Sequence, residues 1–269
     1  MPSIQIGDIN IYYEIHGRGD ALLFIHGLGS SSQDWESQVS FFASNYKVVT
    51  VDLRGHGKSD KPKEQYSVEM FSADIAALLI KLSLYPVHVV GVSMGAAVGW
   101  HLALDYPELV KSLVITNMAA TISVRTLAEK WRFYSRVAVV RLLGMGTMGK
   151  IIAKNLFPDP NQRNLRREMK KRWSGNDPHS YLNSLLALKN WSIAERLENI
   201  VCPVLVVSAE YDYAPLEHVK NYTAKMRNAE LVRIEGSHHA LPVERPEAYN
   251  RTVENFLVKA KEWQTGRKK

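Results

Sequence analysis

Residues 87–100 constrain the fold of this chain more than any other segment. A valine-rich run leads to Ser93 and an alanine-rich run follows it, with Gly91 and Gly95 two positions away on either side. The first run predicts a strand buried on both faces, and the second predicts a helix packed closely on the sheet. A strand that turns at once into a helix leaves no room for side chains beside the turn, so glycine is needed there. The segment therefore predicts an α/β fold in which Ser93 is held in a strained turn with its hydroxyl exposed.

Two further parts of the chain supply the residues that a serine nucleophile needs. A serine hydroxyl is a poor nucleophile unless a histidine takes its proton and a carboxylate orients that histidine. A predicted strand ends in a turn that carries Asp212, and Glu210 is the only other acid of that turn. The next predicted strand leads to a loop with two adjacent histidines, His238 and His239. The sequence thus offers two acids and two histidines as partners of Ser93.

The order Ser93, Asp212, His239 resembles that of the α/β-hydrolase superfamily, in the branch of small carboxylesterases. In that family the catalytic histidine usually follows a glycine and precedes a glutamate by five positions. His239 stands five positions before Glu244, so the resemblance implies that His239 is the base. His238 occupies the usual glycine position, and this departure leaves the reverse assignment open. The resemblance covers nearly the whole chain and implies a mostly parallel sheet with helices on both faces and an inserted helical cap.

The same resemblance implies an oxyanion hole made of two backbone N–H groups. One belongs to the residue after the nucleophile, which is Met94 here. Residues 22–30 resemble the His-Gly loop of the family and place Leu28 at the second donor position. His26 of this loop is expected to be structural, as in the family. The turn after the next predicted strand carries three residues that we expect to hold loops, namely Asp52, Arg54 and His56.

Alternating strand and helix patterns predict the organisation of the chain. Residues 4–14 predict an antiparallel hairpin at the sheet edge. Further strands are expected near 21–26, 46–52, 87–92, 110–116, 203–208 and 230–234, with helices between them. More than eighty residues, mainly helical in pattern, lie between the strand that ends near Thr116 and the strand that starts at Pro203. This segment is too long for one crossover connection. We interpret residues 120–195 as a helical cap inserted between two parts of an α/β-hydrolase core, 1–119 and 196–269.

The predicted cap carries the basic charge of the chain. Residues 121–175 contain thirteen Lys and Arg and three acidic residues, whereas the whole chain has a net charge of only +7. Helical spacing gathers five cations on one face, namely Arg163, Arg166, Arg167, Lys170 and Lys171. Leu165, Met169 and Trp173 fall on another face of the same helix. A stripe of one charge sign suits an anionic partner, and a merely solvated helix face is the alternative.

Three kinds of anionic partner could bind this stripe. Nucleic acid is not expected, because no aromatic platform is interleaved with the cations and no DNA-binding motif is present. An anionic membrane surface would use the amphipathic pattern of the helix. An acidic acyl carrier protein is the partner implied by a second resemblance. Capped hydrolases that cleave the methyl ester of pimeloyl-acyl carrier protein in biotin biosynthesis use basic cap residues in this way, and this chain is similar in length, triad order and cap charge. Those hydrolases commonly have a tryptophan in the turn directly before the nucleophile, where this chain has Val92.

The sequence predicts an ester hydrolase with an acyl-enzyme intermediate. His239 deprotonates Ser93 for attack on the ester, Asp212 orients His239, and His239 then activates water. A generic carboxylesterase acting on small free esters, a carbon–carbon bond hydrolase, an acyltransferase and a non-catalytic ligand-binding protein remain alternatives. Apolar cap residues are candidates for an acyl pocket or for the core of the cap: Leu127, Trp131, Phe133, Leu142, Leu143, Phe157 and Leu186.

Composition adds expectations about class and location. With 269 residues, 46% of them hydrophobic, the chain can bury the core of one domain with an excursion. The first ten residues lack the pattern of a signal peptide, and no 18-residue apolar run is present, so a cytoplasmic location without a membrane span is expected. Cys202 is the only cysteine and cannot form an internal disulfide. Histidines do not cluster at metal-binding spacing and no phosphate loop is visible, so no metal or cofactor is expected.

Overall fold

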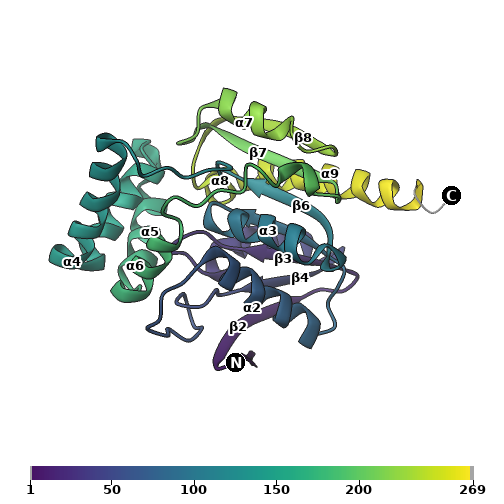
Figure 1. The fold of residues 1–269 in the computed structure, drawn as a ribbon, viewed down its shortest axis with the longest axis horizontal. Coiled ribbons are helices and arrows are strands. Elements are labelled where there is room, and N and C mark those ends of the chain that lie inside the picture. The colour runs from purple at the N-terminus through teal and green to yellow at the C-terminus, as the bar shows by residue number, and fades with distance from the viewer. Residues whose placement is uncertain (1, 267–269) are drawn as a thin grey trace.

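An eight-stranded sheet forms the centre of the molecule in a computed structural model, which describes residues 2–266 (Figure 1). Its strands lie in the order β1-β2-β4-β3-β5-β6-β7-β8. Their bounds are β1 Ser3–Ile6, β2 Ile9–His16, β3 Asp20–Ile25, β4 Tyr46–Val51, β5 Val87–Val92, β6 Val110–Thr116, β7 Val204–Tyr211 and β8 Ala229–His238. β2 pairs antiparallel with both β1 and β4. All other neighbouring strands, from β4 to β8 in the sheet order, pair in parallel. The predicted edge hairpin and mostly parallel sheet are confirmed.

Both faces of the sheet are covered because successive side chains of a strand point to opposite faces. In β3, Leu23 and Ile25 join one hydrophobic cluster, whereas Leu22 and Phe24 join the other. The first cluster receives α2 (Val68–Lys81), α3 (Met94–Asp105) and α7 (Leu216–Thr223). The second receives α1 (Glu36–Phe42), α8 (Leu241–Glu244) and α9 (Pro246–Gly266). The valine-rich central strands are therefore buried over most of their length, as their composition predicted.

Three helices between β6 and β7 lie together beyond one end of the sheet, at the left of Figure 1. They are α4 (Leu127–Leu156), α5 (Arg163–Ser174) and α6 (Pro178–Ala187). The backbone of α4 leaves helical geometry at Gly144, which has φ +73°. The chain enters and leaves this helical group side by side, because Ile122 N donates to Trp191 O at 2.8 Å and Ile193 N donates to Ala120 O at 2.9 Å.

The side chains of this helical group differ from two sequence expectations. Met169 and Trp173 of α5 are buried, so the apolar face of α5 is used for packing and is not free to lie on a membrane. Five of the candidate acyl-pocket residues are exposed, and only Phe133 and Phe157 are buried; the exposed ones are Leu127, Trp131, Leu142, Leu143 and Leu186. Among residues 2–266, no helix combines the length and hydropathy needed to cross a bilayer.

The strands β7 and β8 extend beyond their predicted ends. The polar and glycine-containing segment 235–238 resembles a loop in composition, yet it pairs with β7 until Tyr211 faces His238. Main-chain pairing needs no apolar side chain, and a register shift after Ala209, with Gly236 at φ +61°, accommodates the irregular residues. The extension carries Asp212 and His239 to the same end of two neighbouring strands.

Candidate active site

The turn at Ser93 has the strained geometry that its sequence predicts. Ser93 lies between β5 and α3 with φ +52° and ψ −120°, a region that L-residues rarely occupy. A Cβ at Gly91 would collide with the carbonyl of Gly95, and a Cβ at Gly95 would collide with the carbonyl of Ile25. The backbone N–H of Ser93 donates to Thr116 O at 2.9 Å, which ties the turn to the end of β6. Only glycine therefore fits at positions 91 and 95, two residues before and after the serine.

The structure pairs one of the two histidines with one of the two acids. His239 Nδ1 donates to Asp212 Oδ1 at 2.5 Å, and the Asp212 side chain is only 3% exposed. A ring that donates from Nδ1 to a carboxylate keeps the lone pair of Nε2 free to accept a proton. This arrangement suits a general base for a neighbouring hydroxyl.

The alternative acid and histidine have other partners. Glu210 accepts a hydrogen bond from Gly236 N at 2.8 Å and pairs with Arg233 at 3.2 Å. His238 donates from Nδ1 to Glu244 Oε1 at 2.8 Å, and its backbone N–H donates to the same carboxylate. Glu244 therefore holds the histidine loop. These contacts favour Asp212 and His239 over the alternative pair.

Asn117 links the end of β6 to β7 and to the end of β8, and the sequence pattern did not single it out. Its Oδ1 accepts from Ala209 N at 2.8 Å, and its Nδ2 donates to the carbonyl of His239 at 2.9 Å. It directly follows Thr116, whose carbonyl holds Ser93. The backbone of Asn117 has φ +51°, which asparagine tolerates better than most residues. An asparagine at the end of a buried parallel strand was the available signal.

The loop after β3 presents an unpaired N–H beside Ser93. Leu53 N donates to His26 Nε2 at 3.0 Å, so the proton of this neutral ring lies on Nδ1, which donates to Gly27 O at 2.8 Å. Burial lowers the pKa of His26 to about 4. The carbonyl of Gly27 and the N–H of Leu28 belong to one trans peptide and point in opposite directions. By holding the carbonyl, His26 fixes the direction of the Leu28 N–H, which has no acceptor within residues 2–266.

Gly27 lies directly against the nucleophile turn, because a Cβ built on it would stand 3.4 Å from Ser93 Cβ. Met94 is the first residue of α3, where a backbone N–H has no partner within the helix. The Leu28 and Met94 N–H groups therefore flank Ser93 as donors without internal acceptors. That arrangement is suited to an oxyanion.

The three loop residues expected to be structural make internal contacts. Asp52 accepts from Ser32 N and Lys58 N at 2.7 and 2.8 Å. Arg54 forms a bidentate pair with Asp74. Burial lowers the pKa of His56 to about 3, and its Nδ1 lies 3.0 Å from the carbonyl of Arg54.

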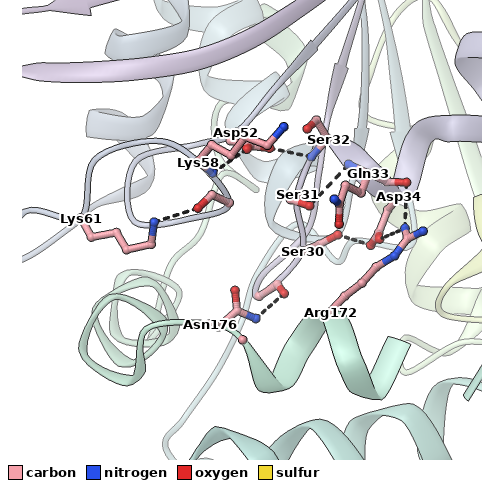
Figure 2. Close-up of a pocket in the computed structure, with 13 residues that line it drawn as sticks. Ser30, Ser31, Ser32, Gln33, Asp34, Asp52, Lys58, Lys61, Arg172 and Asn176 are labelled. Atoms are coloured by element: carbon pink, nitrogen blue, oxygen red, sulfur yellow. Dashed lines mark hydrogen bonds and ion pairs between the residues drawn. The ribbon is translucent and has the colours of Figure 1, made fainter. Parts of the chain in front are cut away.

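A pocket of about 190 Å³ lies beside this loop, between the loops after β3 and β4 and the end of α5 (Figure 2). Asn176 Nδ2 donates to Gly29 O at 2.6 Å, and Arg172 pairs with Asp34 at 3.0 Å. Ser93, Asp212 and His239 are not among its lining residues. Polar contacts at the wall of this pocket join the end of α5 to the loop that carries Leu28.

The five predicted partner-binding cations do not all have free side chains. Arg163, Arg167, Lys170 and Lys171 are exposed on α5. Arg166 is half-buried, and its guanidinium donates to the carbonyls of Pro158 and Asp159. Four of the five side chains are thus exposed, and Arg166 also makes contacts within the helical group.

Neither a metal centre nor a reactive thiol is visible in the part of the chain that the structure describes. No three His, Cys, Asp or Glu side chains of residues 2–266 group as metal ligands. Cys202 is buried, and this burial raises the pKa of its thiol to about 12.

Comparisons with known proteins agree with the fold. A family described as "alpha/beta hydrolase fold" matches residues 20–139. The 3-oxoadipate enol-lactonase 2 of Acinetobacter baylyi is 27% identical over 93% of this chain and 94% of its own length. A Caulobacter protein whose name assigns it to carbamate hydrolases is 31% identical over 94% of this chain and 98% of its own length. The enol-lactonase structure from Burkholderia xenovorans has a TM-score of 0.87, with 22% identity, 96% of this chain covered and 100% of that chain.

Proposed function

Because this chain belongs to the α/β-hydrolase fold family, we propose that Ser93, His239 and Asp212 are the catalytic triad with which it hydrolyses carboxylic esters. The chain is a hydrolase, as its relatives are, and the substrate and the roles of individual residues are the proposal. The observation that carries it is the 2.5 Å bond between His239 Nδ1 and Asp212. It orients the ring so that Nε2 can serve a serine held in a strained turn.

The proposed reaction has two steps. His239 Nε2 takes the proton of the Ser93 hydroxyl as its oxygen attacks the ester carbonyl. The N–H groups of Leu28 and Met94 donate to the oxyanion that forms. The intermediate collapses to an acyl-enzyme, and His239 passes its proton to the leaving alcohol. It then deprotonates a water molecule, which hydrolyses the acyl-enzyme and regenerates Ser93.

Turnover of p-nitrophenyl butyrate by the wild type and Ser93→Ala tests this proposal. We expect Ser93→Ala to lose turnover while its thermal midpoint does not fall, because the strained hydroxyl is the nucleophile. An alkyl fluorophosphonate should add to the wild type and not to Ser93→Ala in intact-protein mass spectra. Full activity of folded Ser93→Ala would falsify the mechanism, and no turnover by the wild type would favour a non-catalytic binding protein.

We also propose residues 120–195 as a cap over the carboxyl ends of the strands, between core segments 1–119 and 196–269. Support comes from the paired entry and exit of this segment near Ile122 and Ile193. The contact of Asn176 with the loop after β3 adds to it. The cytoplasmic location expected from the sequence stays a prediction.

An ester presented by an acidic acyl carrier protein is a second candidate substrate, of the kind used in biotin biosynthesis. The observation that favours it is the set of four exposed cations on α5, which has Glu168 as its one acidic residue. The relatives named above are an enol-lactonase and a carbamate hydrolase, and neither name mentions a carrier protein. The small free ester is therefore the first candidate.

A further inference from the structure

An arginine of the cap lies one side chain away from the loop of the proposed oxyanion hole. Arg136 of α4 donates from Nε to the hydroxyl of Tyr181 at 2.5 Å, and its guanidinium lies 5.3 Å from the centre of that ring. The Tyr181 ring packs on Gly29, where a Cβ would stand 3.0 Å from Tyr181 Cε2. Gly29 directly follows Leu28, the proposed donor.

The same arginine also acts on a residue beside the proposed base. The Tyr213 ring lies 4.4 Å from the ring of His239, measured between centroids. Desolvation raises the pKa of the Tyr213 phenol, and the positive charges of Arg136 and Arg132 oppose this increase. The charge of Arg136 thus acts on the phenol that packs against His239, and its contact with Tyr181 places it beside the loop that carries Leu28.

The charge of Arg136 has no carboxylate partner within residues 2–266. Its one hydrogen-bond acceptor there is the neutral Tyr181 hydroxyl. The buried Arg54, by contrast, pairs with Asp74, and Arg172 pairs with Asp34. A half-buried guanidinium loses hydration, and without an anion this loss is not compensated.

The contact of Arg136 with Tyr181 leaves the two terminal guanidinium nitrogens of the arginine available for binding. The bond to Tyr181 uses Nε, so no contact within the described chain occupies the two terminal nitrogens. Terminal guanidinium nitrogens bind carboxylates in a planar, bidentate manner. The buried Tyr181, 1% exposed, holds the arginine in place from one side.

We propose that Arg136 binds a carboxylate of the substrate, so that this enzyme acts on esters or lactones that carry a second, anionic group. The inference rests on the proposed ester hydrolysis and names the substrate class of that same site. The substrate carboxylate compensates the charge of Arg136 while the ester carbonyl lies at Ser93.

Equilibrium binding to the Ser93→Ala protein tests the subsite without turnover. The ligands are the monomethyl esters of succinate, glutarate and adipate, each compared with the neutral ester in which a carboxamide replaces the carboxylate. We expect at least one carboxylate to bind about tenfold or more tightly than its amide, because a charge-assisted bidentate bond is lost in the amide. Arg136→Met should abolish this preference, and Arg136→Lys should restore part of it.

Two control variants separate charge recognition from a structural role. Lys189 donates to Tyr134 at 2.8 Å and lies 5.3 Å from its ring centre, so Lys189→Met removes a similar cation–phenol pair elsewhere in the cap. Tyr181→Phe removes the hydroxyl that holds Arg136 and keeps the charge of the arginine, so it should weaken the preference for the carboxylate without abolishing it. Lys189→Met should retain the full preference. Equal binding of acids and amides at every length would overturn the subsite, and so would equal losses in Arg136→Met and Lys189→Met.

The subsite and the catalytic proposal fail in different ways. If the wild type hydrolyses p-nitrophenyl butyrate but binds acids and amides equally, only the subsite is wrong. If the carboxylate preference is present and depends on Arg136 while no ester is hydrolysed, the subsite stands and the catalytic proposal is wrong.

Discussion

At the scale of single residues, the contacts of His238 and His239 differ enough to predict different losses. We expect His239→Ala to lower kcat by about three orders of magnitude, because triad members act as a unit. His238→Ala should lose far less, since its ring bonds to Glu244. Steady-state kinetics on p-nitrophenyl butyrate checks both variants. The reverse ranking would assign the base to His238.

Asn117 is expected to be a positioning residue. Asn117→Gly removes the amide without a penalty for the positive φ, and we expect kcat to fall on the order of tenfold or more with little change in KM. Asn183→Ala is the matched control, because this buried amide binds the carbonyls of Lys63 and Glu64 away from the site. Asn183→Ala should lose stability and keep its kcat. If both variants lose only stability, Asn117 is an ordinary structural residue.

At the scale of elements, the strand–turn–helix of β5 and α3 was predictable because it is local. Steric exclusion at Gly91 and Gly95 acts between atoms close in sequence or in the adjacent strand, so the pattern alone indicates the turn. The strand periods of the central sheet were predictable for the same reason. The ends of β7 and β8 were not, since their last residues pair through the main chain despite a loop-like composition.

The exposed face of α5 predicts a salt-dependent effect if a carrier protein is the partner. Arg167→Glu combined with Lys170→Glu should raise KM for a carrier-bound methyl ester several-fold and leave a small neutral ester unchanged. Added salt should weaken the wild-type preference. Lys225→Glu with Arg227→Glu, which changes two exposed cations outside helices α4 to α6, is the control. If the two double variants behave alike on the carrier-bound ester, the α5 face is only solvated surface.

At the scale of the whole molecule, buried histidines predict that stability falls with acid. Burial lowers the pKa of His26 and His88 to about 4 and that of His56 to about 3. Below the usual value near 6.5 the unfolded chain binds protons that the folded chain does not, so the free energy of unfolding decreases as pH falls. Each histidine contributes about 1.4 kcal/mol per pH unit between 6.5 and its folded pKa.

Urea unfolding at pH 7, 6 and 5, followed by tryptophan fluorescence, measures this slope. His88→Leu should reduce it by up to about 1.4 kcal/mol per pH unit, because one group that binds a proton only in the unfolded chain is removed. His218→Gln, a change at an exposed residue, should leave it as in the wild type. A slope that is the same in His88→Leu and the wild type would contradict the assignment. Asp34 and Asp74, whose pKa values are raised by burial, add effects of the opposite sign as the pH falls.

The sequence by itself determined the fold class, the nucleophile turn at Ser93 and the short set of acids and histidines that can serve it. These follow from side-chain periodicity and from steric limits within a few residues, which act wherever the chain is placed. Only the tertiary structure decided which acid and histidine pair, that Asn117 links the ends of β6, β7 and β8, and that Arg166 bonds to the carbonyls of Pro158 and Asp159. It also placed Arg136 of α4 against Tyr181, which packs on the loop of Leu28. Those choices depend on strand register and on contacts between residues far apart in sequence, which no local pattern encodes.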